Sequence, residues 1–173
     1  VLIFSRTKHG ARKLAKLVEA DGFSVAELHS NRSPSQRQRA MEGFRRGQYQ
    51  VMVATNIAAR GIDVNHITHV ISTDVPDVPE DYVHRIGRTG RAGAEGDAFI
   101  LVSPDEEGSL ARIERQVGQR LPRVTLPDFD YTLHAPKVIA PVNNGRPQQQ
   151  PRNKQAGPHN QRPARPQKGG GRT

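Results

Sequence analysis

Residues 25–54, with the sequence VAELHSNRSPSQRQRAMEGFRRGQYQVMVA, hold a strand, a helix and a second strand. The short runs at 25–28 and 51–54 are typical of strands. Between them, Ser33-Pro34-Ser35-Gln36 has the capping-box pattern with proline in the first turn, so a helix is expected to begin there and to end near Gly47. A strand, a helix and a strand joined this closely predict a parallel pair, because parallel strands are usually connected through a helix.

The same alternation continues on both sides of this unit. The further elements are expected as strands at 1–4, 67–72 and 98–102, helices over 8–21, from 79 and over 105–118, and a helical turn at 56–60. Alternating elements with short connections predict an α/β fold, an open parallel sheet with helices on both faces. In such sheets, ligands bind beyond the carboxyl ends of the strands.

The charge of the chain is concentrated near its carboxyl end. The 173 residues have a formal net charge of +9, and residues 137–173 contain eight of the Lys and Arg residues but no Asp or Glu. The rest of the chain is therefore nearly neutral. From about residue 136 the sequence is rich in Pro, Gln, Asn, Gly and Arg, which predicts disorder. We expect a folded domain at 1–120, an extended segment packed on it at 121–136, and a disordered basic tail at 137–173.

Other features exclude several classes of protein. The chain has no cysteine, which rules out disulfides and thiolate metal sites. It has no apolar run of about 18 residues that would cross a membrane, and no secretory signal. His66 and His69 lack a third ligand, so no metal site is expected. Because the sequence starts at Val1 inside an apolar run, we expect it to be part of a longer, cytoplasmic protein.

The segment His84-Arg85-Ile86-Gly87-Arg88-Thr89-Gly90-Arg91 carries three arginines at a spacing of three. One interpretation is the solvated basic face of a helix, since residues three apart share a face. The other is a phosphate site. The two glycines would end the helix and present Arg88 and Arg91 from a loop, where a planar guanidinium suits a phosphate. Composition alone leaves both interpretations open.

This segment resembles motif VI of the DEAD-box RNA helicases. The resemblance implies that Arg88 and Arg91 are arginine fingers, which reach ATP bound on a partner domain. It also implies that His84 couples the state of ATP to closure of the two domains, and that Arg85 makes structural contacts. The chemistry agrees with the phosphate interpretation, because charge develops on the γ-phosphate during hydrolysis.

Residues 53–63 resemble motif V of the same family. The structural alternative is a buried strand followed by a helical turn with a glycine cap. The resemblance implies that Thr55 and Arg60 bind RNA phosphates and that Gly61 and Asp63 lie at the bound ATP. Hydroxyl and guanidinium groups suit phosphate oxygens, and a carboxylate suits ribose hydroxyls.

Two further segments resemble family motifs. Residues 33–39 resemble the Gln-x-x-Arg element, which implies RNA contacts for Gln36 and Arg39. A capped helix start explains the same residues, and the two interpretations are compatible because helix N-termini attract phosphate. Residues 1–8 resemble motif IV and place Arg6 near RNA.

Two features limit the resemblance. Asn56 stands where Asp is commoner in motif V, and the sequence has neither Gly-x-x-x-x-Gly-Lys-Ser/Thr nor Asp-Glu-Ala-Asp. The resemblance therefore implies the second RecA-like domain of an ATP-dependent RNA helicase that unwinds RNA duplexes or remodels ribonucleoproteins. ATP and Mg²⁺ would be bound mainly by an N-terminal RecA-like domain, so this chain alone is expected to be inactive.

The implied partners are RNA, the N-terminal domain, and the ribosome or the RNA-degradation machinery. Residues 126–130, LPDFD, together with the basic tail, resemble the bacterial RhlE-type subgroup. Two other functions remain open. One is a non-catalytic RNA-binding or scaffold module, and the other is a domain of a DNA-directed superfamily 2 helicase.

Overall fold

The computed structural model describes residues 1–91, 93 and 95–132. The chain divides into two units, Val1–Val124 and Thr125–Thr173, and each is treated separately. The predicted disordered tail at 137–173 and the end of the predicted extended segment, at 133–136, lie outside the described residues. The start of that segment belongs to the first unit, where Leu121 packs against the helices described below.

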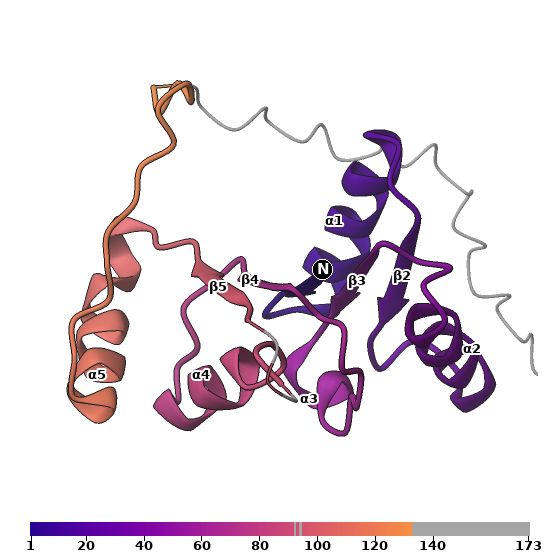
Figure 1. Cartoon of the computed structure of the whole chain (residues 1–173). Helices are drawn as coiled ribbons and strands as arrows, with labels where there is room; N and C mark the ends of the chain where they lie inside the picture. Colours follow the sequence, from indigo (N-terminus) through magenta and orange to yellow (C-terminus); the bar gives the residue numbers. More distant parts are fainter. Residues whose placement is uncertain (92, 94, 133–173) are drawn as a thin grey trace, which may run out of the picture. The chain divides into compact units, whose positions relative to one another are not determined.

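The first unit alternates strands and helices along the chain (Figure 1). In order, the elements are β1 (Leu2–Phe4), α1 (Lys8–Ala20), β2 (Val25–Leu28), α2 (Pro34–Arg45), β3 (Val51–Ala54), α3 (Asn56–Ala59), β4 (His69–Ser72), α4 (Pro79–Ile86), β5 (Asp97–Ile100), a 3₁₀ turn (Pro104–Glu106) and α5 (Glu107–Val117).

The five strands form one parallel sheet in the order β2-β3-β1-β4-β5. This confirms the predicted open parallel α/β fold. In the part of the chain that the structure describes, strands β2 and β5 each have one neighbour, so they are the edges of the sheet. Strand β1 lies between β3 and β4, and all three run in the same direction. The loops that follow them therefore leave the sheet at the same end, the carboxyl ends of the strands.

The two faces of the sheet are covered by different helices. Ile3 packs on one face with Ala15 of α1. Leu2 and Phe4 pack on the opposite face with Phe44 of α2. Successive strand residues point to opposite faces, so this alternation places helices on both faces, as predicted.

Helices α4 and α5 share a third apolar cluster. It is formed by Val75, Tyr82, Leu110 and Ile113, all of which are buried. This cluster anchors α4, and α4 carries the start of the segment that resembles motif VI. The position of the candidate site thus depends on packing between elements that are distant in sequence.

Element boundaries differ from the prediction mainly at β4 and β5. Strand β4 starts at His69 instead of residue 67, and β5 covers Asp97–Ile100 instead of 98–102. The two strands pair from His69 with Asp97 to Ser72 with Ile100. Their lengths are therefore matched to each other, a constraint that a single run of apolar residues does not reveal. No helix in the described part of the chain is both long and apolar enough to cross a membrane.

Candidate nucleotide and RNA interface

Arg85 is the buried centre of the loops beyond the sheet. Its guanidinium donates hydrogen bonds to Asn56 Oδ1 at 2.8 Å, to the Asp74 carbonyl at 3.0 Å and to Asp74 Oδ1 at 3.0 Å. It also lies 5.3 Å from the centre of the Phe4 ring. Only 2% of Arg85 is exposed, so the residue joins the loops after β1, β3 and β4 from within. The implied structural role of Arg85 agrees with this geometry.

Asn56 uses both ends of its amide. While Oδ1 accepts from Arg85, Nδ2 donates to Asp81 Oδ2 at 3.3 Å. Asp81 in turn lies 3.8 Å from the Arg60 guanidinium. An aspartate at position 56 could accept from Arg85 but could not donate to Asp81. The departure from the commoner residue therefore adds a link from the buried Arg85 to the exposed Arg60.

The two predicted arginine fingers lie against the loop after α3. Arg88 donates from Nη1 to the Ile62 carbonyl at 2.9 Å and from Nε to the His84 carbonyl at 3.2 Å. Partial burial, and then the neighbouring charge of Arg91, lower the pKa of Arg88. Arg88 and His84 line a small cavity of about 20 Å³ together with Arg60.

Arg91 faces the predicted ribose contact. It donates from Nε to the Gly87 carbonyl at 2.8 Å, and its Nη1 lies 3.3 Å from Asp63 Oδ1. The Asp63 side chain is 80% exposed. Gly61 has a φ of 84°, a left-handed conformation that favours glycine and turns the chain between α3 and Asp63. The structure thus brings four of the predicted nucleotide residues, on two separate segments, into one cluster: Gly61, Asp63, Arg88 and Arg91.

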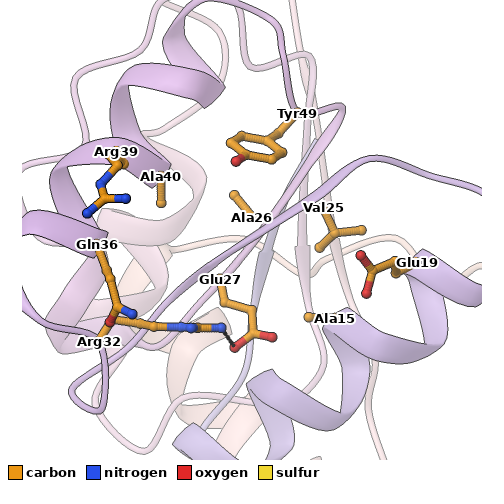
Figure 2. Close-up of a pocket in the computed structure, with 10 residues that line it drawn as sticks. All are labelled: Ala15, Glu19, Val25, Ala26, Glu27, Arg32, Gln36, Arg39, Ala40 and Tyr49. Atoms are coloured by element: carbon orange, nitrogen blue, oxygen red, sulfur yellow. Dashed lines mark hydrogen bonds and ion pairs between the residues drawn. The ribbon is translucent and has the colours of Figure 1, made fainter.

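The predicted RNA residues do not form one surface. Arg60 lines a cavity of about 280 Å³ between α2 and the loop after α3. Gln36 and Arg39 instead line a cavity of about 380 Å³ beside β2 (Figure 2). The Gln36 side chain is also used locally, because its Oε1 accepts from the Ser33 backbone at 2.9 Å and completes the predicted capping box.

Arg37 is a candidate that the sequence reasoning missed. It lines the same cavity as Arg60, and its side chain makes no hydrogen bond or ion pair with another described residue. A signal was present in the sequence. Pro34, Arg37, Gln38 and Met41 all line this cavity, and their spacing is that of one helical face.

Arg6 is tied to the protein more closely than expected. It donates from Nη2 to Glu106 Oε1 at 2.6 Å and to the Val75 carbonyl at 3.2 Å. Its backbone N–H donates to Asp74 Oδ2 at 2.6 Å. Half of the Arg6 side chain is exposed, so it could contact RNA only with the N–H groups that these bonds leave over.

Comparison with known proteins places these segments in a family. Residues 1–93 match the model of the helicase conserved C-terminal domain, which covers both halves of the cluster around Asp63 and Arg91. The chain belongs to that family. Within that family, the chain is a C-terminal domain of the DEAD-box type.

Curated relatives of this DEAD-box domain are much longer proteins. The RNA helicase CrhR of Synechocystis is 47% identical over 127 residues, which are 73% of this chain and 26% of CrhR. The helicase CshA of Geobacillus kaustophilus is 40% identical over 139 residues, 80% of this chain and 30% of CshA. The chain therefore spans between a quarter and a third of the length of these relatives.

Solved structures of DEAD-box proteins have the same fold. E. coli SrmB, bound to regulator of ribonuclease activity A, has a TM-score of 0.72 and 30% identity over 78% of this chain and 79% of the SrmB chain. S. cerevisiae Dbp5 bound to RNA and ADP BeF3 has a TM-score of 0.64 and 33% identity, covering 69% of this chain and 32% of Dbp5. The RhlE-type subgroup remains a prediction.

The DEAD-box domain alone is poorly equipped to hold Mg²⁺. Among the described residues, no group of three or more His, Asp or Glu side chains could hold a metal ion. Asp63 is the one carboxylate in the cluster of nucleotide residues, and Arg91 already faces it. The residues present fit the phosphates and sugar of ATP better than its metal ion.

Proposed function

We propose that this domain supplies arginine fingers and part of the RNA-binding surface to an ATP-dependent RNA helicase. The observation that carries the proposal is the cluster of Arg88 and Arg91 against Gly61 and Asp63. It joins two segments more than 20 residues apart at one edge of the sheet. ATP and Mg²⁺ would be held mainly by an N-terminal RecA-like domain, which this sequence does not contain.

In the nucleotide step, Arg88 and Arg91 stabilise negative charge on the transferred phosphate. Each guanidinium has five N–H donors, and the bonds to backbone carbonyls use two on Arg88 and one on Arg91. The remaining donors are available to phosphate oxygens. When Arg91 turns to a phosphate, Asp63 is released to accept hydrogen bonds from the ribose. His84 faces the N-terminal domain and couples closure to the state of ATP.

In the RNA step, the domain binds phosphates without reading bases. Thr55 and Arg60 follow β3, and Arg37 shares a cavity with Arg60. We add Arg37 to the RNA contacts that the resemblance implies for Arg6, Gln36 and Arg39. ATP-driven closure then holds one strand in a bent form that a duplex cannot keep, and the duplex separates locally.

The buried Arg85 connects the two steps. Asn56 and Asp81 link it to Arg60 on the RNA side. Helix α4 carries Arg85 and leads directly into the loop of Arg88 on the nucleotide side. A movement of Arg88 and Arg91 towards ATP would therefore also shift Arg60 through this chain of contacts.

The test uses the full-length protein and Arg88→Ala, with Arg112→Ala as a control. Arg112 is an exposed residue of α5, and its side chain donates a hydrogen bond to Ser109 of the same helix. We expect Arg88→Ala to lower RNA-stimulated ATP hydrolysis by about 10³-fold or more, while single-strand RNA binding is kept. Loss of RNA binding with intact hydrolysis would reverse the assigned roles.

Two further measurements separate this function from its alternatives. The 173-residue chain alone should show no RNA-stimulated ATP hydrolysis, and the full-length protein should respond to RNA more strongly than to DNA. Equal activation by DNA supports a DNA-directed helicase, and absence of RNA-stimulated hydrolysis in the unsubstituted full-length protein supports a scaffold. We also propose that the protein is cytoplasmic and that its partner is the RNA-degradation machinery or the ribosome. The complex of SrmB with a regulator of ribonuclease activity supports the first of these partners.

A further inference from the structure

Among the described residues, strand β2 has one edge without a partner strand. The Ser24 and Leu28 carbonyls accept from Val51 and Thr55 on the β3 side. Along a strand, alternate residues direct their N–H and C=O groups to opposite edges. The backbone groups of Val25 and Glu27 therefore point away from β3, to the free edge of the sheet.

These two residues form the floor of a groove with two walls. The groove encloses about 380 Å³. Helix α1 contributes Ala15 and Glu19 on one side, whereas Arg39 and Ala40 of α2, with Tyr49, stand on the other (Figure 2). The small side chains of the two alanines leave space directly beside the strand.

The position of Tyr49 is set by Gly43 of α2. A Cβ built on Gly43 would lie 2.4 Å from Cε2 of the Tyr49 ring, which is closer than any normal contact. The ring thus rests directly on the helix backbone, and the wall opposite α1 is formed without a ligand.

The charged side chains that line the groove carry equal numbers of positive and negative charges. Glu27 is paired with Arg32 at 2.8 Å and with His29 at 3.0 Å. Burial tends to raise the pKa of Glu27, but the hydrogen bonds from His29 and Arg32 lower it overall, so the carboxylate stays ionised. Arg39 and Glu19 remain on opposite walls, and neither pairs with another described residue.

We propose that this groove binds an extended segment of a partner protein, which adds to the sheet as a strand beside β2. The floor offers unpaired donors and acceptors of the kind that an added strand uses. Side chains of the added strand would point alternately to the two walls. The charges select acidic side chains facing Arg39 and basic side chains facing Glu19.

A polypeptide fits the floor of the groove better than RNA does, although Gln36 and Arg39 in its lining are also proposed RNA contacts. The lining has two arginines and two glutamates, so it has no net charge to attract a chain of phosphates. An uncharged peptide backbone meets no such penalty. The groove also lies on the opposite side of α2 from the cavity shared by Arg37 and Arg60.

The test uses the ¹⁵N-labelled 173-residue chain and a capped seven-residue peptide in which lysine and glutamate alternate. Amide hydrogen exchange is followed by NMR. In the free chain, the amides of Val25 and Glu27 should exchange faster than those of Ala26 and Leu28. The peptide should slow the exchange of Val25 and Glu27 selectively. A ten-nucleotide oligouridine is the comparison probe, and selective protection of the same two amides by RNA instead of peptide would overturn the proposal.

Two N-methylated peptides test the backbone bonds. One carries a methyl group on the backbone nitrogen of every lysine, and the other on the backbone nitrogen of every glutamate. In an alternating peptide, only one of these two sets of N–H groups faces β2, so only one peptide loses the donors that β2 would use. Loss of two hydrogen bonds corresponds to about tenfold in affinity. We expect that loss for one peptide and little change for the other. Equal affinities would show that no strand is added.

Glu19→Lys tests the charge pattern, with Lys13→Glu on the same helix but outside the groove lining as the control. Glu19→Lys should weaken binding of the lysine–glutamate peptide and strengthen binding of a serine–glutamate peptide of the same length. Lys13→Glu should have neither effect. If Lys13→Glu shifts the affinities of the two peptides by as much in the opposite direction, only the overall charge matters and the proposed groove is wrong. Peptide binding is measured without ATP hydrolysis or RNA unwinding, so it can fail while the proposed helicase function stands.

Discussion

Replacing Arg85 with alanine should destabilise the domain more than any surface substitution. Arg85 is buried, and its three hydrogen bonds go to Asn56 and Asp74. The Asp74 side chain is itself only 11% exposed. Removal of the guanidinium would leave a buried carboxylate without its charged partner.

The loss of unfolding free energy in Arg85→Ala depends on the hydrogen bonds that Asp74 keeps. Removing one member of a buried ion pair costs about 3–5 kcal/mol. Asp74 keeps hydrogen bonds from the Arg6 backbone at 2.6 Å and from Thr73 Oγ1 at 3.4 Å, so we expect the lower end, about 3 kcal/mol. At about 4 °C per kcal/mol for a domain of this size, the melting temperature should fall by roughly 12 °C.

Urea unfolding of the 173-residue chain, followed by circular dichroism, measures this free energy. Arg85→Lys keeps the charge but loses the planar fork, so its cost should lie between the wild type and Arg85→Ala. The exposed Arg112→Ala should stay within about 0.5 kcal/mol of the wild type. If Arg85→Ala costs no more than Arg112→Ala, the buried pair does not stabilise the fold and the reasoning about Arg85 is wrong.

Two other predictions concern Glu106 and Arg37. Burial tends to raise the pKa of Glu106, but hydrogen bonds from Ser103, Val75 and Arg6 lower it below its ordinary value of 4.5. The stabilisation from Glu106 is therefore fully present above about pH 4.5 and is lost as the pH falls through the lowered pKa. Urea unfolding should show Glu106→Gln less stable than wild type at pH 7, with a smaller difference at pH 3, and a difference independent of pH would contradict this. In the full-length protein, Arg37→Ala should reduce the slope of log affinity for single-stranded RNA against log salt by about 0.7. An unchanged slope would remove Arg37 from the RNA surface.

Much of the fold follows from short stretches of sequence. The capping box at Ser33 and Gln36 formed as expected, because its donors and acceptors lie within one helical turn. The left-handed Gly118 ends α5 for an equally local reason. The parallel sheet was predictable because strands and helices alternate with short connections. The family was recognisable because motif VI is one continuous segment.

Tertiary structure decided which of the predicted site residues share a cavity and which do not. Adjacent residues of a helix lie about 100° apart around its axis, so the packing of α2 on the sheet decided that Arg37 joins Arg60 while Gln36 and Arg39 line the groove beside β2. The pairing of Arg91 with Asp63 and of Arg85 with Asp74 likewise required separate loops to meet. The sequence alone determined which elements form and which segments carry the chemistry, because those signals are local. Which side chains share a surface was decided only when the helices packed against the sheet, since that packing sets their rotation.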